Sequence, residues 1–487
     1  MGKNKEIFKK INNLSPAAKA SFWFVVSNVM LKGISFITTP IFTRILGPND
    51  YGITSVFVSW EGVISIFATL VLSGGVYNVA QTKYADDIDG YTSSMIGLTF
   101  VASLIVYTGC IAINIIAPSL FGLSNAYLFF MWIQTFTNAA ITFWLMRKRF
   151  VYDYKSVITY TISNAILSPA LAIVAILLFP NHAAYAKIIG AGVAGIVIGL
   201  YMAVYWFLKG KKTFNKLYWG YALKFNLPLI PHYLSSTLLN SSDKLMINSM
   251  VNTAAAGIYG IAHSITGLIS IITQSINYSL IPYTLQSIKS GNIKGLRRTT
   301  TACLALVSVV CLGVMLFAKE GILIFATEKY IDAVWYIAPL TLSVLFSFLY
   351  GIIGNIMFYY EKTWQMSAIT IFCAVINIVT NYFGIKMFGP VAAGYTTLLC
   401  SIIQVTTYYF VVRRYEKHLT KIIDLRFVAL IVAVYIGFMI YATAFYNYFW
   451  LRAGLIALVG VAVLILHKKI IALFKSMKSK EDTVAQT

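Results

Sequence analysis

Ionisable side chains occur inside long apolar stretches of this chain, where a charge needs a specific partner or water. Lys32 lies near the middle of the first stretch, and Glu61 lies in the middle of the next one. Asp243 and Lys244 are neighbours in a later stretch. A mid-membrane ammonium group faces a wet cavity or an acid. We therefore expect Lys32 to bind an anionic ligand or, alternatively, to form an ion pair with Glu61.

The other charged candidates have two interpretations each. Arg44 lies near the end of the stretch that holds Lys32, where its guanidinium can hold a phosphate bidentately or anchor the helix among headgroups. Glu61 is a candidate Na⁺ or H⁺ site as well as a counter-charge. Neighbouring helical residues do not face each other. Asp243 and Lys244 are therefore expected to act singly, in substrate binding, ion coupling or gating, or in a salt bridge between helices.

Uncharged polar residues complete the set of candidates. His232 and His263 titrate near neutral pH, which suits coupling or gating, although a single helical His also serves in packing. Side-chain amides can donate hydrogen bonds to sugar hydroxyls or tie helices together. The amides expected to line a substrate cavity are Asn240, Gln274 and Asn377.

The elements that carry these residues are about fourteen apolar segments, each near the 20 residues that span a membrane as a helix. The chain is 59% hydrophobic and 11% charged, which excludes a soluble domain. Segments this long and continuous are helices rather than barrel strands. The predicted spans are residues 17–46, 51–80, 91–117, 126–150, 157–179, 185–208, 221–251, 254–287, 296–317, 331–359, 364–387, 391–412, 423–445 and 449–473.

Positive charge alternates between the connections. Thirty of the 38 Lys and Arg residues fall in the two terminal segments and the even-numbered connections, or in the span ends within six residues of them, which predicts that both termini are cytoplasmic. The net charge of +22 therefore faces lipid headgroups and indicates no nucleic-acid partner.

The two halves of the chain are weakly similar. An offset of 205 residues places residues 46–52 on 251–257 and 64–66 on 269–271. Six spans separate the copies, so two six-helix bundles related by an axis along the membrane normal are expected. The predicted parts are a cytoplasmic segment 1–16, a first bundle 17–208, a basic linker 209–220, a second bundle 221–412, two further helices within 413–473 and a cytoplasmic tail 474–487.

Motifs for catalysis are missing from the sequence. It has no phosphate-binding glycine loop, zinc motif or nucleophile motif, and all five cysteines lie inside spans without metal-ligand spacing. The protein is therefore not expected to be an enzyme or to hold a cofactor or a metal site. Coupling of transport to a Na⁺ or H⁺ gradient stays open. A membrane-embedded glycosyl polymerase would need a large outer loop, and no connection is long enough to form one.

One stretch carries a family resemblance. The sequence TPIFTRILGPNDYG at residues 39–52 resembles the signature of polysaccharide-biosynthesis flippases, the O-antigen and capsule repeat-unit exporters of the multidrug, oligosaccharidyl-lipid and polysaccharide (MOP) superfamily. Supporting stretches are Leu227-Pro228-Leu229-Ile230-Pro231, Ser242-Asp243-Lys244, Ala256-Gly257-Ile258-Tyr259 and Ile281-Pro282.

The resemblance implies a V-shaped pair of bundles in a bacterial cytoplasmic membrane. Such a protein carries an undecaprenyl-diphosphate-linked oligosaccharide from the inner to the outer leaflet by alternating access, alongside a polysaccharide polymerase and glycosyltransferases. In this family an acid at the position of Asp243 is a recurrent feature. Two alternatives on the same scaffold stay open: a peptidoglycan-precursor flippase and a cation-coupled multidrug extruder, which would have acidic rather than basic residues in its N-terminal cavity.

Overall fold

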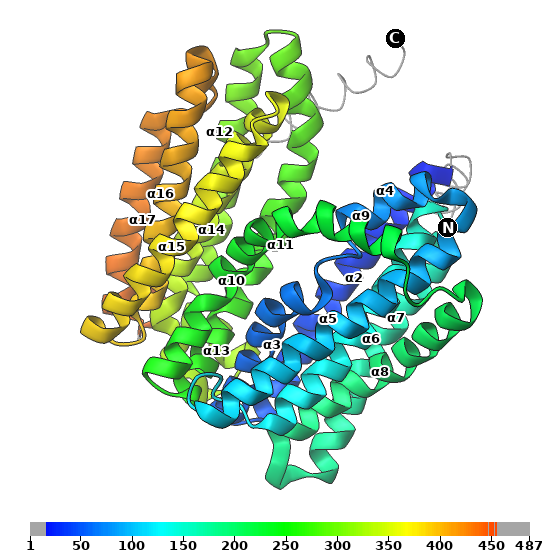
Figure 1. Cartoon of the computed structure of the whole chain (residues 1–487). Helices are drawn as coiled ribbons and strands as arrows, with labels where there is room; N and C mark the ends of the chain where they lie inside the picture. The colour runs from blue at the N-terminus through cyan, green and yellow to red at the C-terminus, as the bar shows by residue number, and fades with distance from the viewer. Residues whose placement is uncertain (1–15, 447, 452, 455–487) are drawn as a thin grey trace, which may run out of the picture. The chain divides into compact units, whose positions relative to one another are not determined.

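The computed structural model describes residues 16–446, 448–451 and 453–454, and these residues form helices and turns without a strand. Eleven helices in this part of the chain are long and apolar enough to cross a membrane, so the protein is a multi-pass membrane protein (Figure 1). The chain divides into two compact units, residues 1–257 and 258–487. The predicted helical class is confirmed.

Unit 1 contains helices α2 to α10 and the first residues of α11. Its bounds are α2 Pro16–Ile45, α3 Pro48–Thr69, α4 Gly75–Lys83, η1 Ala85–Asp87, α5 Ile88–Ile116, α6 Asn125–Phe150, α7 Tyr154–Leu178, η2 Pro180–His182, α8 Ala183–Gly210, α9 Lys216–Asn226, η3 Leu227–Leu229 and α10 Ile230–Met250.

Long helices pack side by side within unit 1. α8 packs against α5, α6 and α7, while α3 packs against α5 and α10 (Figure 1). A buried cluster that includes Tyr77, Tyr91, Phe143 and Trp206 joins α4, α5, α6, α8 and α9. Outside this core, Leu177 and Leu178 at the end of α7 are 68% and 67% exposed, as expected for a lipid-facing surface.

Unit 2 contains the rest of α11 and the helices that follow it. The bounds are α11 Thr253–Lys289, α12 Ile293–Leu316, α13 Ala318–Phe325, η4 Glu328–Ala333, α14 Val334–Tyr359, α15 Thr363–Phe388, α16 Ala392–Tyr415, η5 Lys417–Ile422 and α17 Leu425–Phe445.

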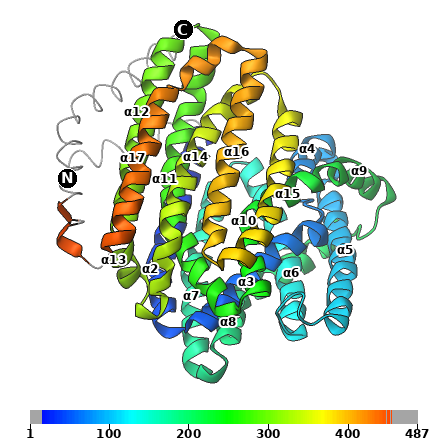
Figure 2. The ribbon, with the colours of Figure 1, turned by 90° about the vertical axis from the view of Figure 1, so that its left-hand side faces the viewer.

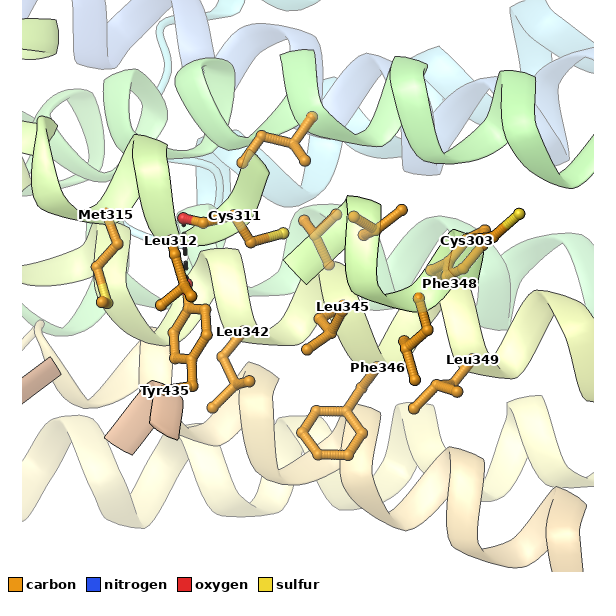
Figure 3. Packing of buried hydrophobic residues seen from close by; sticks show 14 of the residues in the cluster. Cys303, Cys311, Leu312, Met315, Leu342, Leu345, Phe346, Phe348, Leu349 and Tyr435 are labelled. Atoms are coloured by element: carbon orange, nitrogen blue, oxygen red, sulfur yellow. Dashed lines mark hydrogen bonds between the residues drawn. The ribbon is translucent and has the colours of Figure 1, made fainter. Parts of the chain in front are cut away.

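The centre of unit 2 is α14, which packs against α12 and α16 (Figure 2). The core around it is aliphatic and aromatic, and it includes Leu342, Leu345 and Leu349 of α14 with Cys303, Cys311 and Met315 of α12 (Figure 3). The Tyr435 hydroxyl of α17 hydrogen-bonds Thr341 and also lies 3.5 Å from the Cys311 carbonyl oxygen. The cysteines serve as packing residues in this core, as their apolar surroundings predicted.

Two predicted spans are interrupted in the structure. The span 51–80 is divided into α3 and α4, with Leu70 and Val71 between them at φ 50° and 49°. The span 221–251 is divided into α9, η3 and α10, where Pro228 lacks the amide donor that a continuous helix needs. The hydropathy pattern missed both breaks because the interrupting residues are themselves apolar.

The predicted number of fourteen spans is not confirmed. α9 is shorter than a span, and α10 is too polar to count among the eleven apolar helices. The fourteenth predicted span, residues 449–473, lies mostly outside the described residues.

Candidate functional site

The candidate site of unit 1 is built on the antiparallel pair of α3 and α10. Where α3 begins, glycine lets its backbone meet the first turns of α11, the helix that directly follows α10. A Cβ atom added to Gly52 would lie 1.9 Å from the carbonyl oxygen of Thr253, and one added to Gly257 would lie 2.2 Å from that of Pro48. Only glycine fits at either position.

This contact is reciprocal. Gly52 packs on the carbonyl of Thr253, and Gly257 packs on the carbonyl of Pro48. The 205-residue offset relates Pro48 to Thr253 and Gly52 to Gly257, so each contact is the counterpart of the other. A local two-fold relation between residues 48–52 and 253–257 gives this geometry, with the offset that the sequence showed. The turn from residue 46 to 52 in the family-like stretch thus has a packing role.

The other end of the pair is also fixed. The Asn226 side-chain amide, at the break before η3, donates a 2.9 Å hydrogen bond to the carbonyl oxygen of Leu70, at the break after α3. The Asn226 side chain is 2% exposed. The two helix interruptions therefore lie against each other, and α3 and α10 are held together at both ends.

Glu61 lies midway along α3, about 20 Å from the start of the helix. Its neighbour Gly62 faces Thr237 of α10, with 3.5 Å between a Cβ atom added to the glycine and the threonine methyl group. Glu61 is half-buried, and no ion pair joins it to a side chain in the described part of the chain. A mid-membrane carboxyl group without a described counter-charge is a candidate for ion or proton binding.

α10 is polar along most of its length. Its 21 residues reach about 31 Å, enough to cross a hydrocarbon core of about 30 Å. Asp243 is buried, Lys244 is half-buried and Asn240 is exposed. The Nδ1 atom of His232 is buried without a hydrogen-bond partner among the described residues. A polar helix of this length belongs beside a water-filled space rather than against lipid.

Lys187 lies near the start of α8 and of the predicted span 185–208, and it was not among the candidates predicted from the sequence. Its Nζ donates a 3.2 Å hydrogen bond to the Thr54 hydroxyl of α3. The same Nζ lies 4.6 Å from the ring centres of Phe42 and Tyr51. Cation–π contacts of this kind stabilise a desolvated ammonium group. No described carboxylate forms an ion pair with Lys187.

Helix α2 places the remaining charged candidates of unit 1. Lys32 lies in α2, but its side chain is outside the described residues, so its pairing with Glu61 stays a prediction. Arg44 is exposed near the end of α2, and its Nη1 donates a 2.9 Å hydrogen bond to the Pro40 carbonyl oxygen. Its roles in phosphate binding and anchoring both stay predictions.

The candidates of unit 2 lie on two helices. On α11, His263 is half-buried with its ring centre 6.3 Å from that of Tyr259, and Gln274 is exposed. On α15, Asn377 is 1% exposed and accepts a 3.1 Å hydrogen bond from the Asn381 amide. The structure thus encloses Asn377 between helices and leaves Gln274 accessible; the roles of all three stay predictions.

Comparison with known proteins gives the family. The sequence model of the family described as polysaccharide biosynthesis protein matches residues 17–287, more than half of the 487 residues. A second family model, MatE, matches residues 228–383. The Lsg locus putative protein 1 of Haemophilus influenzae is 21% identical over 373 residues, which cover 74% of this chain and 90% of that protein. An uncharacterized membrane protein of Methanocaldococcus jannaschii is 22% identical over 426 residues, or 82% and 99% of the two chains.

Two solved structures show the fold. The inward closed conformation of the lipid II flippase MurJ superposes with a TM-score of 0.67 at 13% identity, covering 92% of this chain and 99% of that one. An inward-facing multidrug resistance MATE family transporter of the MOP superfamily has a TM-score of 0.56 at 15% identity, with coverage of 80% and 95%. These proteins are transporters rather than enzymes, in agreement with the sequence prediction. The chain thus belongs to the polysaccharide biosynthesis protein family and has the fold of the MOP-superfamily flippases and transporters.

Proposed function

We propose that the protein is a flippase for undecaprenyl-diphosphate-linked oligosaccharide repeat units. It moves them from the inner to the outer leaflet of a bacterial cytoplasmic membrane by alternating access, and so supplies surface polysaccharide biosynthesis. Family membership supports the substrate class. A polysaccharide polymerase at the outer face and glycosyltransferases at the inner face are the partners that this role requires.

The polar helix α10 carries the structural argument. Moving a diphosphate and a sugar chain across hydrocarbon strips water from charges and hydroxyl groups, at a prohibitive cost without polar replacement. α10 offers hydroxyl, amide and charged groups along a helix of membrane-spanning length. The polyprenyl tail needs no such path, because it can stay in the lipid throughout transport.

Three lysines are the proposed phosphate-binding groups. Lys187 and Lys244 lie on α8 and α10 without an ion pair to any described carboxylate, and Lys32 lies near the middle of α2. Lys187 lies about 6 Å from the start of α8 and Lys32 about 24 Å from the start of α2. Because α8 starts at the predicted outer side, these depths suit successive contacts with a diphosphate on its way outward.

A peptidoglycan-precursor flippase is the second candidate, and the fold shared with the lipid II flippase MurJ favours it. Its substrate has the same diphosphate and polyprenyl tail, so a cation does not distinguish the two. A multidrug extruder, suggested by the MatE match, would instead bind cations through acidic groups.

Substrate accumulation tests the proposal. Cells that lose the protein are expected to accumulate the undecaprenyl-linked repeat unit on the cytoplasmic leaflet, and wild-type protein should restore its export. Accumulation of the peptidoglycan precursor instead would favour the second candidate. Unchanged lipid intermediates together with increased drug sensitivity would overturn both flippase assignments.

Two substitutions test the predicted pair on α2 and α3. Lys32→Ala is expected to abolish rescue at normal membrane abundance, and full activity would remove Lys32 from the mechanism. Glu61→Gln should also impair transport. If the Lys32→Ala/Glu61→Gln double variant transports normally, the two charges merely balance each other.

A further inference from the structure

A pocket of about 280 Å³ lies between α6 and α8 near the end of unit 1 that carries the α6–α7 connection. The charge pattern of the sequence predicts that this end is cytoplasmic. Trp144 and Trp206 form aromatic walls, and Arg147, Lys148 and Lys209 also line the pocket. α6 and α8 run side by side here (Figure 1).

The pocket carries an excess of positive charge. Arg147 and Lys209 share one carboxylate: Arg147 Nη1 donates to Asp89 Oδ1, while Lys209 Nζ lies 3.2 Å from Asp89 Oδ2. Lys148 is balanced separately by Asp153, at 2.7 Å. Two cations against one carboxylate leave a single unneutralised positive charge. The Arg147 guanidinium also stacks on the Trp206 ring at 4.9 Å, which leaves further N–H donors for another acceptor.

One wall of the pocket faces the surrounding medium. Tyr201 and Tyr205 of α8 line it and are 65% and 39% exposed, as expected of aromatic residues at headgroup level. An exposed aliphatic stripe continues along α8 toward the opposite membrane surface. Its members are Val193, Val197, Leu200 and Val204. An exposed apolar stripe suited to acyl chains therefore runs along α8 from the pocket.

We propose that this pocket binds the headgroup of an anionic phospholipid of the phosphatidylglycerol type, with its acyl chains along the α8 stripe. A phosphodiester carries one negative charge, which matches the excess positive charge beside Asp89. The volume is slightly below the roughly 300 Å³ of small ligand pockets, which suits a headgroup and not a whole lipid-linked glycan. Basic pockets between membrane helices at the cytoplasmic side bind such headgroups. This inference does not depend on the transported substrate.

Native mass spectrometry of the full-length protein in detergent tests the proposal. The protein is titrated separately with phosphatidylglycerol and with phosphatidylcholine of identical acyl chains. Wild type should bind the first phosphatidylglycerol molecule about fivefold more tightly, as one unneutralised cation predicts. Equal affinities of the wild-type protein for the two lipids would by themselves overturn the proposal.

Lys209→Gln removes the excess charge and leaves the Arg147–Asp89 pair intact, so the preference should disappear, while Lys209→Arg should retain it. Lys212→Gln is the matched control. This residue pairs with Asp87 at 2.6 Å near the same end of the unit, outside the pocket. The control should keep the wild-type preference.

A preference retained by Lys209→Gln, or lost equally in Lys212→Gln, would contradict the assigned site. Undecaprenyl diphosphate is added as a competitor in a third titration. If it displaces bound phosphatidylglycerol from wild type and Lys209→Gln weakens both lipids, the pocket takes a polyprenyl carrier and the assigned occupant is wrong. Loss of transport in knockout cells bears only on the flippase proposal and not on this one.

Discussion

The two units treat polar groups inside the membrane differently. Unit 1 places charged side chains inside its helices, with Glu61 on α3 and Asp243 and Lys244 on α10. It also encloses Lys187 near the start of α8. In the described part of unit 2, charged residues lie near helix ends, and neutral groups occupy the interior. Asn355 donates to Asn277 at 2.9 Å, and Asn381 bridges Asn377 and Thr396.

This difference suits ligand or ion binding in unit 1 and helix packing in unit 2. A buried amide pair satisfies its own hydrogen bonds and ties helices at modest cost. A charge inside the membrane without an ion pair, as at Glu61 in the described part of the chain, is costly and persists where it serves a ligand or an ion. We therefore expect substitutions of the charged residues of unit 1 to change transport more than stability, and those of the buried amides of unit 2 to do the reverse.

The glycine contact of unit 1 gives the largest expected effect. Gly52→Ala forces a Cβ atom against the Thr253 carbonyl oxygen and should destabilise the protein by about 3 kcal/mol. Gly267→Ala in unit 2 is the control. It has nothing within 4 Å of the added atom and should stabilise α11 by up to about 1 kcal/mol. Thermal unfolding in detergent measures both, and equal shifts would contradict the close packing.

The next effect concerns the cation between two aromatic rings. Lys187→Gln should lower the export of lipid-linked repeat units about tenfold or more at unchanged abundance, because phosphate loses a charge-assisted partner. Lys386→Gln in unit 2 is the control, an exposed lysine 5.9 Å from the ring centre of Tyr382. Export is measured as repeat units accessible at the cell surface. An equal loss of export in the two variants would mean that export depends on surface charge and not on Lys187 in particular.

A smaller effect is expected at the amides of unit 2. Asn381→Ala removes the partner of Thr396 and of Asn377 and should reduce stability by about 1–2 kcal/mol, with transport per folded molecule preserved. Gln274→Ala, at an exposed amide in the same unit, should leave stability unchanged. Unfolding temperature and export per folded molecule are both measured. Loss of transport at full stability in Asn381→Ala would make this amide part of the path and weaken the comparison.

The smallest effect is expected at Asp153 and Asp424, the aspartates that cap the starts of α7 and α17. The two units have the same kind of cap here. Hydrogen bonds from Lys148 and Ser156 lower the pKa of Asp153 below its ordinary value, and the Arg297 hydrogen bond does the same for the pKa of Asp424. Each carboxylate also accepts amide hydrogen bonds at the start of a helix, α7 and α17 respectively.

A lowered folded pKa means that each group stabilises the fold above the ordinary aspartate pKa of about 3.9 and ceases to do so as pH falls through its folded value. Asp153→Asn should cost less than about 0.5 kcal/mol at pH 7, because both side chains of the pair are about a third exposed and water screens them. The difference from wild type should be smaller at pH 3 than at pH 7. Thermal unfolding of wild type, Asp153→Asn and Asp424→Asn at pH 7 and pH 3 checks this direction. A stability difference that grows on acidification would contradict it.

The sequence predicted the all-helical membrane fold, because apolar runs of about 20 residues report directly on the thickness of the membrane. The orientation drawn from charge alternation stays a prediction. It placed Glu61 and Asp243 inside helices for the same reason. It missed the break at Leu70, because left-handed backbone at apolar residues leaves no compositional signal. It missed the break after Asn226, because Pro228 lies between two leucines in a run that stays apolar. Lys187 was also missed: its position close to a predicted span end suggested an interfacial charge, and only the tertiary contacts with Thr54 and the two rings show an enclosed one.

The glycine crossing at residues 52 and 257 has a genetic consequence. Each residue touches the backbone of the segment that contains the other, so a bulky side chain at one position also displaces the second. The losses of stability from the two substitutions should therefore not add, because the first already moves the two segments apart and leaves space for the second side chain. Transplanting either five-residue turn into the place of its counterpart, glycine included, should by contrast preserve the crossing.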